Sequence, residues 1–138
     1  MRRRRWAIGE NETAVAGVGC VLAVDDHAPF RAALRRLIET TATLAVVGEA
    51  DSGEAAVALV VELEPDLVIM DVEMPGVDGV AASTQIKRTR PETVVCLVSA
   101  TRPEELRRDA ARCPADAIVW KGDLTPRLLE AIWARHAA

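Results

Sequence analysis

Five polar residues stand directly after short apolar segments of the sequence, where they could form one reactive site. They are Asp25, Asp26, Asp71, Ser99 and Lys121. Neighbouring carboxylates repel one another, but a hard cation such as Mg²⁺, which prefers oxygen ligands, stabilises such a cluster. We therefore expect the three aspartates to bind Mg²⁺. The cation would help neutralise a phosphoryl group arriving at Asp71, and Lys121 and Ser99 would contact the oxygens of that group.

Each of these residues is expected at the carboxyl end of a β-strand or just beyond it. Apolar segments too short for typical helices predict strands at 20–24, 44–48, 67–71, 94–98 and 117–120. Helical patterns follow them, from about 29 to 38, from an N-cap at Ser52 to about 63, from about 80 to 88, from Pro103 to a stop at Pro114, and from Pro126 onward. Five strand–helix units predict a single α/β domain, with a parallel sheet and helices on both faces.

The order of the strands decides whether the aspartates meet. One sequence alone does not give this order, and we expect a flavodoxin-like (βα)5 domain with the order 2-1-3-4-5. In that order the direction of winding reverses between the first and third strands, so Asp25, Asp26 and Asp71 would converge on one crevice. Taken singly, Asp25 or Asp26 is more often a helix N-cap, Ser99 a loop hydroxyl and Lys121 a solvated charge. Their joint position at one edge of the sheet favours a functional site.

The composition is that of one globular domain. The chain has 138 residues, 50% of them hydrophobic and 28% charged, and no apolar run approaches the length of a membrane span. The net charge is −4, but four of the 17 basic residues are the arginines at 2–5, which leaves 13 against 21 acidic residues in the rest. We therefore expect the body of the protein to repel nucleic acid and to have no contact with a membrane.

The three cysteines indicate a reducing environment. Cys20, Cys96 and Cys113 lie far apart and have no C-x-x-C spacing, so they predict neither a zinc site nor a disulfide framework. Cys20 and Cys96 fall in apolar strand segments, where a cysteine behaves as a small hydrophobic residue. A cytoplasmic location fits this pattern best.

The amino-terminal segment has neither a helical period nor a strand pattern. Residues 1–19 therefore predict a disordered tail, and residues 20–138 the folded domain. Glu10, Asn11 and Glu12 occupy the place where a signal peptide would need its apolar region, so secretion is not expected. The arginines at 2–5 are interpreted as a solvated tail, with contact to acidic lipid or nucleic acid as the alternative.

The sequence from about Cys20 to His136 resembles the receiver domain of two-component response regulators. The most specific motif is Asp71-x-x-Met74-Pro75-x-x-x-Gly79, which is joined by the upstream aspartate pair, by Ser99-Ala100 and by Lys121. The resemblance implies that a sensor histidine kinase or a small phosphodonor phosphorylates Asp71, and that Ser99 and Lys121 contact the phosphoryl group.

The resemblance also implies a ligand set for Mg²⁺. Asp26, Asp71 and the backbone carbonyl of Glu73 would bind the ion, and Asp25 would assist through water. Such a domain phosphorylates and dephosphorylates itself and is not expected to turn over an external substrate. Its output would be a shift of the fourth helix, fifth strand and fifth helix, which would expose a face to a downstream protein or to a second copy.

Further segments narrow the resemblance. Val24 to His27 as Val-Asp-Asp-His, then Phe30-Arg31 and the segment 47–50 as Val-Gly-Glu-Ala, are similar to the subgroup usually fused to a helix-turn-helix output domain. No such output domain follows the last helix of this sequence. The position that usually carries Tyr or Phe is Ile118, so the usual aromatic switch is in question, and Trp120 is a candidate for part of its role.

Two more departures from the family pattern occur near the fifth strand. Gly122 follows Lys121 in place of the common proline, and Cys113-Pro114-Ala115 replaces the usual Gly-Ala. Two other functions stay open. One is an Mg²⁺-dependent phosphatase with an aspartyl intermediate, for which Glu73 would be the second acid. The other is a phosphorylation-independent adaptor with the same fold, which Ile118 favours.

Overall fold

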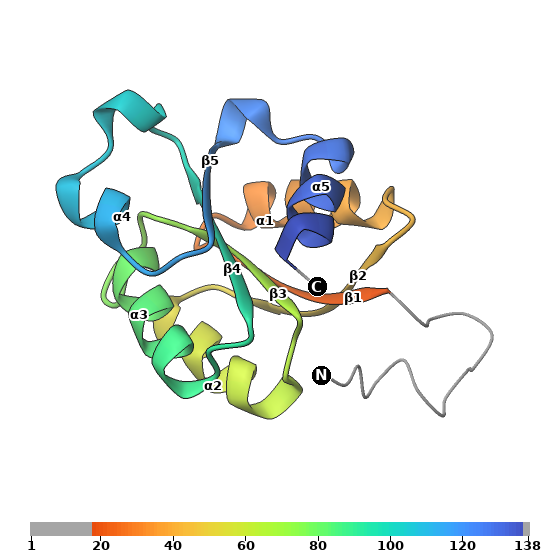
Figure 1. Cartoon of the computed structure of the whole chain (residues 1–138), viewed down its shortest axis with the longest axis horizontal. Helices are drawn as coiled ribbons and strands as arrows, with labels where there is room; N and C mark the ends of the chain where they lie inside the picture. The colour runs from red at the N-terminus through yellow and green to blue at the C-terminus, as the bar shows by residue number, and fades with distance from the viewer. Residues whose placement is uncertain (1–17, 137–138) are drawn as a thin grey trace.

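The computed structural model describes residues 18–136, which form a five-stranded sheet covered by helices (Figure 1). The strands are β1 (Gly19–Val24), β2 (Leu44–Ala50), β3 (Leu67–Asp71), β4 (Val94–Ser99) and β5 (Ala117–Trp120). The helices are α1 (Ala28–Glu39), α2 (Gly53–Leu63), α3 (Gly79–Thr89), α4 (Arg108–Arg112) and α5 (Pro126–His136). Two 3₁₀ turns, η2 (Pro103–Glu105) and η3 (Lys121–Asp123), flank α4 and β5.

All the strand pairs are parallel, and the order of the strands is β2-β1-β3-β4-β5. The predicted flavodoxin-like (βα)5 fold is therefore confirmed. The chain winds one way from β1 to β2 and the other way from β1 to β3, so the topological switch lies between β1 and β3. In this fold the crevice at such a switch is where ligands bind.

The sheet is buried on both faces because helices cover each side. In Figure 1, α1 and α5 lie on one face, and α2, α3 and α4 lie on the other. Successive residues of a strand point to opposite faces, so Val21 and Ala23 pack toward α1 and α5, whereas Leu22 and Val24 pack toward α2 and α3. This two-sided burial explains why β1 and β3 are continuously apolar in sequence.

The largest difference from the predicted elements lies between β4 and β5. The single helix expected from Pro103 to Pro114 is instead the turn η2 followed by the five-residue α4. Arg107 between them has an extended backbone, with φ −57° and ψ 150°. The segment offers little apolar surface, since Ala110 is the buried residue of α4, and a short helix without such packing gains little stability.

The other boundaries differ from the predictions by a few residues. β1 begins at Gly19, β2 continues to Ala50, and the predicted cap Ser52 does accept a hydrogen bond from the amide of Ala55 at 3.0 Å. The greater part of the predicted tail, residues 1–17, lies outside the described residues. Within residues 18–136, no helix is both long and apolar enough to cross a bilayer.

The fifth strand is attached to its neighbours by Lys87 of α3. Its ammonium group donates hydrogen bonds to the carbonyls of Pro91 and Thr93 and to Asp116 Oδ2, at 3.0, 2.8 and 2.9 Å. The same oxygen of Asp116 accepts the amide of Val95 at 2.8 Å. These contacts fix the start of β5 beside β4, and Lys121 follows directly after the other end of β5.

Two cysteines are part of this core, as predicted. Cys20 and Cys96 are fully buried in β1 and β4, and Cys113 is partly exposed. Burial, together with the negative charge of Asp116, raises the pKa of the Cys96 thiol to about 12. Cys96 is therefore a packed thiol rather than a reactive one.

Candidate functional site

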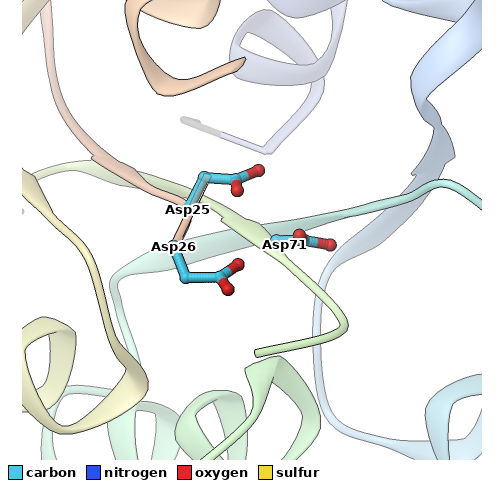
Figure 2. Close-up of side chains that lie close together, drawn as sticks. All are labelled: Asp25, Asp26 and Asp71. Carbon is cyan, nitrogen blue, oxygen red and sulfur yellow. The ribbon is translucent and has the colours of Figure 1, made fainter. Parts of the chain in front are cut away.

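The three aspartates converge at the carboxyl edge of the sheet. One carboxylate oxygen from each of Asp25, Asp26 and Asp71 lies within 4.8 Å of the others. Figure 2 shows Asp25 and Asp26 at the end of β1 and Asp71 at the end of β3, with all three carboxylates directed to the same side. Asp25 is fully buried, Asp71 is 7% exposed and Asp26 is exposed, so the cluster opens to solvent on one side.

The loop between β3 and α3 fixes the position of Asp71. Asp71 Oδ1 accepts a hydrogen bond from the amide of Glu73 at 3.2 Å, and the amide of Gly79 donates to the carbonyl of Val72 at 2.9 Å. A Cβ atom at Gly79 would lie 2.2 Å from the carbonyl oxygen of Asp71. Only glycine allows the start of α3 to approach this closely, so Gly79 sets the tight closure of the loop around Asp71.

The loop after β1 holds Asp25. Asp25 Oδ1 accepts the amide of His27 at 2.8 Å, and its own amide donates to the carbonyl of Ala50 at 3.1 Å. The N-cap of α1 is His27. Neither Asp25 nor Asp26 therefore acts as the helix cap, which was their more ordinary interpretation.

Lys121 provides a cation inside the cluster. Its ammonium nitrogen lies 3.2 Å from Asp25 Oδ2 and 3.4 Å from Asp71 Oδ2, so it bridges the two buried carboxylates. The same nitrogen lies 4.0 Å from the centre of the Phe30 ring, in cation–π geometry. In the sequence Phe30 was noted for its resemblance to one subgroup of the family, and its contact with Lys121 was not predicted because no local sequence signal indicates it.

The charges of the site do not balance, because three carboxylates face one ammonium group. Burial, and next the negative charge of Asp25, raise the pKa of Asp71 above its ordinary value, against the opposing effects of the Glu73 amide and Lys121. The three carboxylates are oxygen donors with an excess of negative charge, and two of the carboxylates are buried. Oxygen donors of this kind are the ligands that Mg²⁺ requires. The donor set therefore fits a divalent cation.

Ser99 and Glu73 lie at the same carboxyl edge of the sheet as the three aspartates. Ser99 is buried at the end of β4, and its hydroxyl accepts the amide of Thr101 at 2.9 Å. The side chain of Glu73 is largely exposed and lies 3.8 Å from Arg107. Two roles stay predictions: the backbone carbonyl of Glu73 as a metal ligand, and the Ser99 hydroxyl as a contact of the phosphoryl group.

Trp120 connects β5 to the loop after β4. Its indole N–H donates to the carbonyl of Ala100 at 3.3 Å, and the guanidinium of Arg102 lies 3.9 Å from the ring centre. A Cβ atom at Gly122 would lie 2.3 Å from a ring carbon of Trp120, so the glycine leaves the space that the indole occupies. Ile118 is half-buried and packs against the core beneath α2 and α3.

Comparison with known proteins agrees with this geometry. The family model of the response regulator receiver domain matches residues 21–133. The chain belongs to the response regulator receiver family. Receiver domains are signalling parts of two-component systems; sensor histidine kinases phosphorylate them, and they generally bind Mg²⁺ at an acidic pocket such as the one formed here by the three aspartates.

The relatives include response regulators longer than this chain and isolated receiver domains. Response regulator GacA of Pseudomonas aeruginosa is 35% identical over 112 residues, which cover 81% of this chain and 52% of that protein. The chain thus spans about half the length of GacA. The receiver domain of the putative regulator NarL from Mycobacterium tuberculosis superposes with a TM-score of 0.79, at 29% identity, and covers 89% of this chain and 99% of that one. A LuxR-family regulator from Aurantimonas superposes with a TM-score of 0.77 at 31% identity. The match covers 87% of this chain and 86% of that one.

The raised pKa of Asp71 predicts how the Asp71→Asn variant changes stability with pH. Because the pKa of Asp71 is raised in the folded state, its ionised form destabilises the fold without Mg²⁺. This loss of stability disappears as the pH falls through the folded-state pKa and below the pKa that Asp71 has in the unfolded chain. We expect Asp71→Asn to raise Tm at pH 7 by about 2–5 °C, the shift that roughly 1 kcal/mol produces in a domain of this size. Thermal unfolding in EDTA measures the difference in Tm between Asp71→Asn and wild type at pH 7, and at pH 3, where the difference should be lost.

A matched control is Glu62→Gln, which removes the same charge from an exposed position of α2. It should leave Tm nearly unchanged at both pH values. An Asp71→Asn variant that is no more stable than wild type at pH 7 would contradict the electrostatic account of the site.

Proposed function

We propose that this receiver domain accepts a phosphoryl group on Asp71 in an Mg²⁺-dependent reaction, with a sensor histidine kinase as the donor. The observation that carries the proposal is the convergence of Asp71 with Asp25, Asp26 and Lys121 in one partly buried cluster. The phosphorylated form would then present a changed surface to another protein. The reducing environment inferred from the cysteines supports the cytoplasm as its location.

The reaction would form an acyl phosphate on the protein. A carboxylate oxygen of Asp71 attacks phosphorus, and the new O–P bond forms as the bond from phosphorus to the donor breaks. The leaving atom, a ring nitrogen of phosphohistidine or an oxygen of acetyl phosphate, keeps the electron pair of the broken bond. Partial burial of Asp71 limits the water that surrounds the reacting atoms.

The chain supplies charges for the oxygens that the phosphoryl group brings. Lys121 already lies between Asp25 and Asp71, and its ammonium group would move only a short way to contact a phosphoryl oxygen on Asp71. The Ser99 hydroxyl would donate a hydrogen bond to another. Asp25, Asp26, Asp71 and the carbonyl of Glu73 would hold Mg²⁺, which when bound supplies the positive charge that this acidic site lacks.

The phosphoryl group would leave again by hydrolysis. Water attacks phosphorus, the O–P bond to Asp71 breaks, and inorganic phosphate departs while the carboxylate is regenerated. Each cycle therefore consumes a phosphodonor and changes only the state of the protein. This is the basis for proposing a signalling acceptor rather than an enzyme that turns over an external substrate.

The output would pass through β5, α4 and α5. Lys121 contacts Asp71 and directly follows Trp120, whose ring is attached to the Ala100–Arg102 loop by a hydrogen bond and by Arg102. A shift of Lys121 toward a phosphoryl group would therefore reach this loop through Trp120. Trp120 would act in place of an aromatic residue at Ile118, and the altered face would bind a downstream protein or a second copy.

Mass spectrometry of the intact chain tests phosphorylation. With acetyl phosphate and Mg²⁺ we expect one added phosphoryl group on wild type and on Glu62→Gln, and none on Asp71→Asn or in EDTA. The reason is that Asp71 contacts Lys121 and lies beside two other acids, and that it is 7% exposed whereas Asp25 is fully buried. An adduct that persists in Asp71→Asn, or that needs no divalent cation, would contradict the proposal, and steady turnover of p-nitrophenyl phosphate would favour the phosphatase.

Tryptophan fluorescence tests the output. Beryllofluoride with Mg²⁺ should change the emission of wild type, and the change should be largely lost in Trp120→Phe, because Trp120 lies beside Lys121 and the loop. Light scattering of the same samples reports whether a second copy binds. Emission and oligomeric state could both be the same with and without beryllofluoride, while mass spectrometry shows that acetyl phosphate does phosphorylate Asp71. The phosphorylation-independent adaptor would then be the better account.

A further inference from the structure

Arg31 of α1 reaches back to the loop that carries the first two aspartates. Its Nη1 donates a hydrogen bond to the backbone carbonyl of Asp25 at 2.6 Å. Its Nε donates to Glu49 Oε1 at 3.2 Å. The guanidinium therefore joins the end of β1 to the end of β2 while it is attached to the first turns of α1.

The carbonyl of Asp25 is a sensitive point of the backbone. It belongs to the peptide group between Asp25 and Asp26, so its direction sets the direction in which Asp26 leaves the strand. Asp25 is fully buried, and its amide is already bound to the carbonyl of Ala50. A buried carbonyl without its hydrogen bond is costly, so loss of Arg31 would favour rotation of this peptide group.

Glu49 holds Arg31 in place. It stands in β2 opposite Ala23 of β1, next to the residue that binds the Asp25 amide. The side chains of Arg31 and Glu49 are 21% and 31% exposed, so the pair is partly shielded from solvent. A guanidinium can bind a carboxylate through Nε and a carbonyl through Nη1 at the same time, whereas a lysine has a single nitrogen for both.

We propose that Arg31 is a positioning residue for the metal site. Its fork between Glu49 and the Asp25 carbonyl holds the loop 25–27 so that the carboxylates of Asp25 and Asp26 already face Asp71 before a cation arrives. This inference rests on the proposed function. Arg31 has no part in the chemical step and acts only through the peptide group that it orients.

Arg35 provides a matched control for the charge. It lies one turn further along α1 and pairs with the other carboxylate oxygen of Glu49 and with Glu39. Its contacts do not include the carbonyl of Asp25, as the hydrogen bonds of the described residues show. Arg35→Ala therefore removes the same charge from the same helix and the same acidic partner, and leaves the loop contact in place.

Calorimetric titration of the full chain with Mg²⁺ at pH 7 tests the proposal. We expect Arg31→Ala to weaken Mg²⁺ binding about tenfold, the lower end of the losses seen when groups that orient metal ligands are removed. Arg35→Ala should change it by less than about twofold, because surface charge alone contributes little at physiological salt. Arg31→Lys, which keeps the charge and loses the fork, should resemble Arg31→Ala more than wild type.

A second readout separates positioning from chemistry. The rate of phosphorylation by acetyl phosphate is measured against Mg²⁺ concentration for wild type and Arg31→Ala. A positioning role predicts that half-maximal rate moves to about tenfold higher Mg²⁺, while the rate at saturating Mg²⁺ stays near that of wild type. Equal Mg²⁺ affinity in Arg31→Ala and Arg35→Ala would overturn the inference, as would an Arg31→Lys variant that binds like wild type.

Two further outcomes are distinguishable. If Arg31→Ala fails to fold by circular dichroism, Arg31→Lys and Glu49→Gln carry the test, and wild-type affinity in both overturns the inference. If wild type itself binds no Mg²⁺ and gains no phosphoryl group, the proposed function fails. If wild type does both and the Arg31 variants match it, only the role of Arg31 fails.

Discussion

Repulsion among carboxylates at the end of the sheet is the constraint on which the site depends. Asp25 and Asp71 are largely buried and share the ammonium group of Lys121, and one carboxylate oxygen of each lies within 4.8 Å of the other and of an oxygen of Asp26. Burial, and next the charge of Asp25, raise the pKa of Asp71, so the ionised form of Asp71 is under electrostatic stress in the site without a cation. That stress is a reason for the site to bind a divalent cation.

The rest of the fold brings these charges together and prevents them from separating. The reversal of strand order between β1 and β3 makes the two aspartate-bearing strands neighbours. Close packing at Gly79 closes the loop behind Asp71, and Lys87 fixes β5, which delivers Lys121 from the other side of the site. A rigid scaffold therefore keeps three like charges close, which flexible loops alone would not do.

Local patterns in the sequence were enough to predict the strands and the polar residues at their ends, whereas the order 2-1-3-4-5, and with it the acidic cluster, was expected from the flavodoxin-like fold and not read from the sequence. Apolar runs that end on polar residues identify buried parallel strands, and the edge where the polar residues stand follows from the topology. The break between η2 and α4 was not predicted, because the charge pattern and the prolines suited a helix while its weak packing could be judged only in three dimensions. The contacts of Phe30 with Lys121 and of Arg31 with Asp25 were missed for a related reason, since each joins residues of separate elements.

The most direct test of the central claim is a crystal structure of the chain grown with Mg²⁺ and beryllofluoride. The account predicts a metal ion coordinated by carboxylate oxygens of the aspartate cluster, beryllofluoride attached to Asp71, and Lys121 in contact with a fluorine atom. A pocket without an ion, with the three carboxylates turned apart or Lys121 still bridging Asp25 and Asp71, would contradict it.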